Sequence, residues 1–118
     1  MKKLLLVIAL LHFPVWAQSE KKEVTLKGEI VDMHCYLTRH GGGRGAEHAG
    51  CANACLGRGV TPGFIAEGDK LYLLFHEKMN SVKDRIAGMA GQKVTITGYV
   101  VERDGVKAIE LLKVEPAN

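Results

Sequence analysis

The sequence predicts a small, mainly β protein of five strands with one or two short helices, on three observations. The segments 24–32 and 93–101 alternate apolar and polar residues, as strands with one buried face do. Gly-Asp at 68–69 and Arg-Asp-Gly at 103–105 are turn signals between apolar runs, and they predict two hairpins. Between these hairpins, apolar residues recur at helical spacing.

The other three strands carry weaker patterns. They are predicted at 63–67, 69–77 and 106–114. In the strand at 69–77, the alternation assigns Leu71, Leu73 and Phe75 to one face. In the last strand the alternation slips between Leu111 and Leu112, which predicts either a β-bulge or a strand with both faces partly buried.

A helix is predicted between the third and fourth strands. Its apolar stripe comprises Met79, Val82, Ile86 and Met89, at spacings of three and four. Methionines can bind soft metals, but at this spacing they are typical of core packing. We therefore assign the stripe to the core.

The predicted order is strand, long insert, hairpin, helix, hairpin. This order resembles the OB-fold, a five-stranded Greek-key barrel with its helix between the third and fourth strands. The resemblance covers nearly all of residues 24–118 and implies one OB-like barrel domain, with a helical Cys/His insert at 32–60 between strands one and two. OB-folds commonly bind ligands with this loop. An SH3-like barrel or a small open sandwich with one helix is the alternative.

The first residues indicate export. Residues 1–17 combine two lysines, an apolar run and small residues before the cleavage point, as a signal peptide does. We expect a periplasmic or secreted protein with an irregular, disordered start at 18–23 and no stable membrane anchor. Without the leader's lysines, fourteen basic residues face thirteen acidic ones, so the charge does not favour a nucleic-acid partner.

The insert at 32–60 carries the chemistry. It contains all three cysteines, an odd number that leaves one thiol unpaired in an oxidising compartment unless a metal, a partner or a redox role occupies it. A helix is expected over 46–56, where helical spacing places His48, Cys51 and Cys55 on one face.

A metal site is the preferred interpretation of this insert. Cys35, just beyond the first strand, completes a Cys3His set with Cys51, Cys55 and His48, with His34 and His40 as secondary candidates. Asp32 could orient the imidazole. Thiolates favour copper and zinc, with copper preferred, and a role in metal storage or delivery to a partner protein would follow. The Cys-x3-Cys spacing is similar to that of Sco-type copper chaperones and of the copper A centre.

Other interpretations stay open. In a thiol-disulfide redox protein, Cys51 and Cys55 would cycle and Cys35 would resolve. In an OB-type module that binds a peptide or an oligosaccharide, a disulfide would merely staple the loop. Non-covalent haem on His34 or His48 is a further alternative. No residue pattern indicates turnover, so an enzyme is not expected.

Overall fold

The structure, a computed structural model, describes residues 21–118. The predicted signal peptide at 1–17 and positions 18–20 of the predicted irregular start lie outside the described residues. The elements in chain order are β1 (Lys22–Asp32), α1 (Met33–Thr38), the 3-10 turns η1 (His40–Gly42) and η2 (Ala46–His48), α2 (Ala49–Gly57), β2 (Pro62–Ala66), β3 (Lys70–His76), α3 (Lys83–Ile86), β4 (Lys93–Arg103) and β5 (Val106–Pro116).

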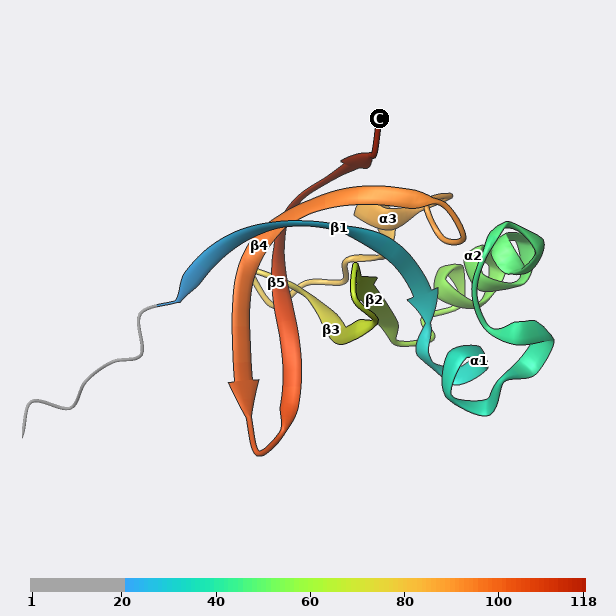
Figure 1. The fold of residues 1–118 in the computed structure, drawn as a ribbon, viewed down its shortest axis with the longest axis horizontal. Helices are drawn as coiled ribbons and strands as arrows, with labels where there is room; N and C mark the ends of the chain where they lie inside the picture. The colour runs from blue at the N-terminus through green and yellow to red at the C-terminus, as the bar shows by residue number, and fades with distance from the viewer. Residues whose placement is uncertain (1–20) are drawn as a thin grey trace, which may run out of the picture.

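The five strands form one sheet that closes on itself in the order β1-β2-β3-β5-β4. β1 pairs antiparallel with both β2 and β4, while β2 with β3 and β4 with β5 form the two hairpins. β3 and β5 run parallel and close the ring. Figure 1 shows α1 and α2 together beyond the end of β1. The predicted mainly β, five-stranded arrangement with short helices is confirmed.

Two strand details test the sequence pattern. β1 begins at Lys22, opposite Val100, so it includes two residues of the irregular start predicted at 18–23. In β5 the register shifts where Thr97 faces Lys113 and the next residue of β4 faces Leu111. One residue of β5 is therefore unopposed, and the predicted bulge is confirmed.

Leu71, Leu73 and Phe75 lie at alternate positions of β3 as predicted, but their face is not the one that packs into the core. Leu74 is 1% exposed and belongs to the core with the partly buried Tyr72, whereas Phe75 is 46% exposed. Leu71 and Leu73 are only half-buried. Nearly every residue of this strand is apolar, so alternation alone could not select the inward face.

The predicted methionine stripe is only partly buried. Val82 and Ile86 belong to the core, but Met79 is 98% exposed. Met79 has a left-handed backbone (φ 56°) and donates its N–H to the His76 carbonyl at 3.1 Å, so it forms a turn. α3 therefore begins only at Lys83.

The core fills the barrel and extends beneath the insert. Its buried members are Ile30, Ala52, Leu56, Phe64, Ala66, Leu74, Val82, Ile86, Ala90, Val94, Ile96, Ile109 and Leu111. Two of these, Ala52 and Leu56, come from α2, so the insert is anchored in the core. Within residues 21–118, none of the helices has the length and apolar character that a membrane span requires.

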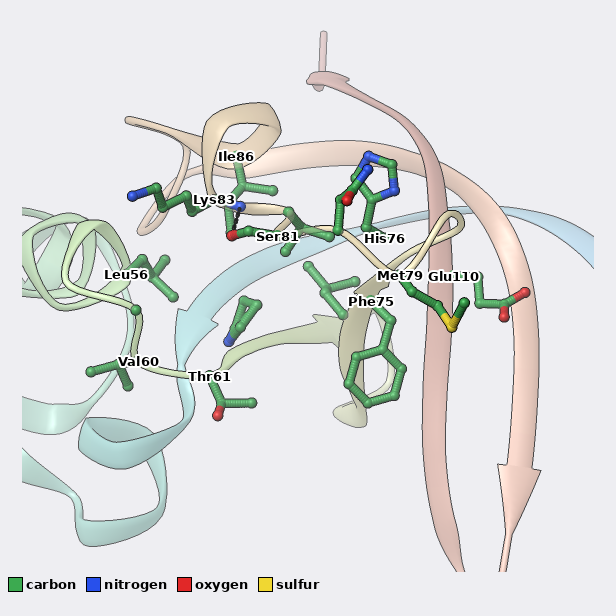
Figure 2. Close-up of a pocket in the computed structure, with 15 residues that line it drawn as sticks. Leu56, Val60, Thr61, Phe75, His76, Met79, Ser81, Lys83, Ile86 and Glu110 are labelled. Atoms are coloured by element: carbon green, nitrogen blue, oxygen red, sulfur yellow. Dashed lines mark hydrogen bonds between the residues drawn. The ribbon is translucent and has the colours of Figure 1, made fainter.

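A mostly apolar cavity of about 480 Å³ lies beside the barrel (Figure 2). Leu56 from α2, Phe75 from β3 and Ile86 from α3 contribute to its lining. No cysteine lines this cavity, so it is separate from the thiols of the insert.

Candidate metal centre

Asp32 ends β1 and begins α1. Its backbone is extended, and its Oδ1 accepts a hydrogen bond from the Cys35 backbone N–H at 2.7 Å. This is an N-cap, which satisfies one of the free N–H groups at the start of the helix. The cap fixes the first turn of α1 and with it the buried Cys35 side chain, which is 3% exposed.

α2 is fixed against the barrel by one face. Ala52 and Leu56 pack into the core. The Asn53 amide donates to the carbonyls of Ala49 at 2.9 Å and Ala90 at 3.3 Å, and its Oδ1 accepts the Ala90 N–H at 3.1 Å. A rotation of α2 about its axis would break these contacts, so they determine where its two cysteines point.

The glycine-rich segment 39–45 packs over His48. Gly41 has a φ of +58°, and a Cβ built there would lie 2.9 Å from His48 Nδ1. Glu29 of β1 accepts a hydrogen bond from Arg44 Nε at 3.3 Å and ties the segment to the barrel. Because Gly41 has no side chain, there is room for the His48 imidazole at this position.

The thiols of Cys35, Cys51 and Cys55 converge between α1 and α2. Their ligand atoms all lie within 4.8 Å of one another, and all three cysteines are free. Three sulfurs that share a tetrahedral zinc at about 2.3 Å lie about 3.8 Å apart, which is within this range. Cys51 is exposed while Cys35 is buried, so this thiol triad opens to solvent on one side.

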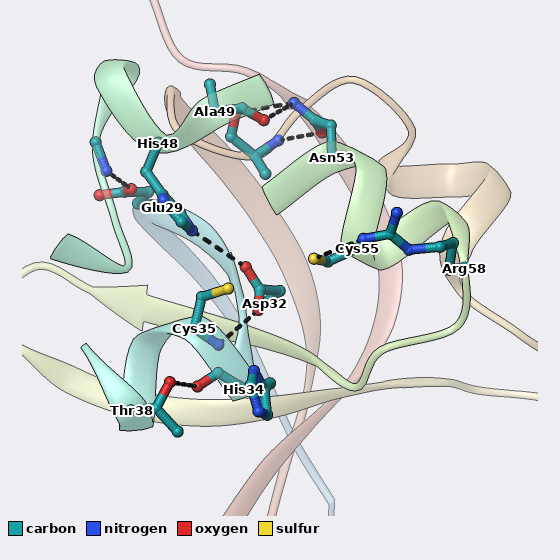
Figure 3. A network of polar contacts seen from close by, with 12 residues as sticks. Glu29, Asp32, His34, Cys35, Thr38, His48, Ala49, Asn53, Cys55 and Arg58 are labelled. Carbon is teal, nitrogen blue, oxygen red and sulfur yellow. Dashed lines mark hydrogen bonds and ion pairs between the residues drawn. The ribbon is translucent and has the colours of Figure 1, made fainter. Parts of the chain in front are cut away.

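A second group shares Cys35 with the first. Asp32, Cys35 and His48 each offer a ligand atom within 4.8 Å of the other two, and all three are buried. The Nε2 of His48 lies 3.5 Å from Asp32 Oδ2. Figure 3 shows the two side chains pointing toward each other. Among the residues that the structure describes, neither of these two atoms has a hydrogen-bond partner. Buried polar atoms without partners are costly, so this pair needs an explanation.

The surroundings of Cys35 favour its protonated form. Burial, with additional effects of the neighbouring Asp32 and Cys51, raises the pKa of the Cys35 thiol to about 12. Arg58 Nη2 donates to Cys55 Sγ at 3.3 Å (Figure 3). A bound metal ion would place a positive charge beside Cys35 and so favour its thiolate form.

No family model, curated protein or solved structure matches the chain. The chemistry of the site must therefore follow from its donor atoms. Three sulfurs, one imidazole nitrogen and one carboxylate oxygen form a soft to borderline donor set, which suits copper and zinc better than magnesium or calcium.

The predicted ligands divide into two overlapping groups. Cys35, Cys51 and Cys55 come together as predicted, and they are close enough to share a metal ion. His48 also lies near Cys35, but its group contains Asp32 in place of the α2 cysteines. The secondary candidates His34 and His40 are exposed and belong to neither group.

From the sequence, Asp32 was expected only to orient the imidazole, whereas its position in the structure makes it a candidate donor. An imidazole-orienting carboxylate faces the ring nitrogen that does not bind metal. Here Asp32 faces Nε2, whereas Nδ1 lies toward Gly41, so Asp32 and His48 direct free atoms at the same space. The sequence did contain a signal for this role of Asp32, namely the Asp-x-x-Cys spacing of an N-cap. An N-cap carboxylate lies beside the first turn of its helix, and here that helix carries Cys35.

Proposed function

We propose that this chain is an exported protein that binds a soft transition metal through the thiolates of Cys35, Cys51 and Cys55, and that it stores or delivers that metal. The observation that carries the proposal is the convergence of three free thiols from two separate helices.

Copper is the preferred metal and zinc the next. Thiolates are soft ligands that select Cu(I), and three of them suffice for a trigonal Cu(I) site. Zinc would take a fourth ligand, which His48, a solvent molecule or a partner side chain could supply. The exposed Cys51 gives an incoming thiol access to the metal, as transfer to a receiving protein requires.

The fold and the leader fit this role. The strand order, the parallel β3–β5 pair and the helix between β3 and β4 support an OB-like barrel. In this barrel the metal site occupies the connection between β1 and β2, where OB-folds commonly bind ligands. The predicted signal peptide at 1–17 would place the protein in the periplasm or outside the cell.

Metal and thiol analysis of the exported protein tests the proposal. We expect copper or zinc in stoichiometric amount in protein purified without chelators, with thiols that react only after the metal is removed. Cys35→Ser, Cys51→Ser and Cys55→Ser should each lose the metal at limiting concentration. His34→Gln is the matched control, because His34 neighbours Cys35 but is exposed and belongs to neither group.

Two other results would overturn the proposal. Metal-free protein with a disulfide between Cys51 and Cys55 would indicate the thiol-disulfide alternative. Metal binding that survives all three serine substitutions would place the ion elsewhere. If neither metal nor exchange activity is found, the cavity in Figure 2 is the feature that supports a ligand-binding module.

A further inference from the structure

Within residues 21–118, Asp32 and His48 carry the two buried side-chain polar atoms that have no hydrogen-bond partner. The Asp32 side chain is fully buried and that of His48 is 4% exposed. Asp32 Oδ1 already accepts the Cys35 N–H, so Oδ2 is the free oxygen. His48 Nδ1 lies toward Gly41, so Nε2 is the free nitrogen. Each side chain thus directs one free atom at the other.

Their separation fits a shared cation better than a hydrogen bond. A charge-assisted hydrogen bond between imidazolium and carboxylate is about 2.7–2.9 Å long. The observed distance from His48 Nε2 to Asp32 Oδ2 is 3.5 Å. Two ligands bound tetrahedrally to zinc at about 2.1 Å lie about 3.4 Å apart, close to what is observed.

Cys35 supplies the third donor. Its ligand atom lies within 4.8 Å of those of Asp32 and His48, and also within 4.8 Å of those of Cys51 and Cys55. A thiolate has enough lone pairs to bind two metal ions at once. Cys35 is the only residue common to both groups, so its Sγ is the atom that would link two ions.

We propose that Asp32, Cys35 and His48 hold a second metal ion, beside the one on the thiol triad, with the Cys35 thiolate bridging the two. This inference rests on the proposed function, because Cys35 is a bridging ligand only if the thiol triad binds metal. The mixed oxygen, nitrogen and sulfur donors suit a borderline divalent cation, with Zn(II) as the probe of choice. The thiol protons pass to solvent when the ions bind.

The charge of the donor groups supports two ions. Three thiolates with one Zn(II) carry a net charge of −1, and the Asp32 carboxylate adds a second negative charge. A second Zn(II) makes this set neutral, and it balances the charge of the fully buried Asp32 carboxylate, which would otherwise be costly to bury. Arg58 is exposed and contacts Cys55, so it does little for Asp32.

Zinc stoichiometry tests the inference. The protein used is the chain from residue 18, which retains every described element. It is reduced, stripped of metal, titrated with Zn(II) and examined by native mass spectrometry. We expect two zinc ions per wild-type chain and one in Asp32→Asn and His48→Gln. Asparagine keeps an oxygen for the cap on the Cys35 N–H, so Asp32→Asn should remain folded, and circular dichroism checks both variants. His34→Gln should still bind two ions.

Cobalt gives a second measurement that a merely structural role would not affect. Two Co(II) ions joined by one thiolate couple magnetically, so the wild-type protein should give a weaker paramagnetic resonance signal than two isolated ions. In Asp32→Asn, which should hold one Co(II), the uncoupled signal should return.

The outcomes separate this inference from the proposed function. Wild-type protein that binds a single zinc, lost in the serine variants, would overturn the second site and keep the thiol triad. Two zinc ions in both Asp32→Asn and His48→Gln would also overturn it, because the second ion would lie elsewhere. Binding of no zinc or copper at all would overturn the proposed function itself.

Discussion

The surroundings of Cys35 favour a role as a metal ligand over a role in thiol exchange. Its thiol is buried and its pKa is raised to about 12, first by burial and then by Asp32. Thiol-disulfide exchange needs a thiolate, and at neutral pH this residue supplies almost none. A resolving role for Cys35 is therefore disfavoured, whereas metal ligation overcomes the same barrier by supplying a positive charge.

The order of alkylation tests this assignment. In reduced, metal-free, folded protein we expect iodoacetamide at pH 8 to modify Cys51 first and Cys35 last, because Cys51 is exposed while Cys35 is buried and protonated. A time course by peptide mass spectrometry measures the three rates. In urea the rates should become similar. Equal rates for Cys35 and Cys51 in the folded protein would contradict the burial and the raised pKa of Cys35.

At the scale of the elements, the insert is organised by contacts from outside it. α1 takes its direction from the cap at the end of β1, and α2 takes its orientation from Leu56 and Asn53. The turn between them contains Gly41, which leaves space for the His48 ring. The site is therefore preorganised by the barrel before any metal binds.

Alanine at Gly41 tests whether this space matters. Gly41→Ala should displace His48 and weaken the second zinc at least about tenfold, since a Cβ would lie 2.9 Å from Nδ1. Gly42→Ala is the matched control, because its φ is also positive but its Cβ would meet no atom within 4 Å. Both variants should lose about 1 kcal/mol of stability from backbone strain. Equal zinc affinity in the two would show that the Gly41 contact is unimportant.

A second element-scale contact lies away from the metal site. Arg85 of α3 binds both oxygens of Glu77, at 2.7 and 3.0 Å, and the carbonyl of Leu111 in β5 at 2.9 Å. Arg85 lowers the pKa of the Glu77 carboxyl below its ordinary value. The paired carboxylate therefore stabilises the folded state above the unfolded pKa, and this contribution is lost as the pH falls through the lowered folded pKa.

Glu77→Gln should show that pH dependence. The difference in unfolding free energy between wild type and variant should be constant near neutral pH and shrink between about pH 5 and pH 2. Urea unfolding of the metal-free protein across this range measures it. Lys113→Gln is a control, because the Lys113 ion pair with Glu115 is exposed and should contribute little. A difference that grows on acidification would have the wrong sign.

The elements also show how far the sequence reaches. Turn chemistry and alternation predicted the two hairpins and the bulge near Leu112, because these depend on local geometry. Helical spacing predicted that Cys51 and Cys55 share a side of α2. The inward face of β3 and the exposure of Met79 depend on how the strands close and where a turn interrupts the helix, which no local pattern records. The meeting of Asp32 with His48 is likewise a tertiary contact.

For the molecule as a whole, the hydrophobic core and the candidate metal ligands are divided between two regions. The barrel supplies most of the buried core, while the insert from 32 to 60 adds only Ala52 and Leu56 to it. The polar side of the insert instead holds the unsatisfied atoms of Asp32 and His48. The barrel should therefore fold without metal, and the insert should gain most from it.

Hydrogen exchange measures this division directly. On addition of Zn(II) we expect residues 33–58 to gain about tenfold or more protection, because the ions link α1 to α2 and suppress their local opening. β4 and β5 should change little, since they contribute no ligand to either group. The triple variant Cys35→Ser, Cys51→Ser, Cys55→Ser should show no zinc-dependent protection. Equal protection of β4, β5 and the insert by zinc would mean that the metal acts on folding of the whole barrel. That result would contradict a site that is preorganised before metal binds.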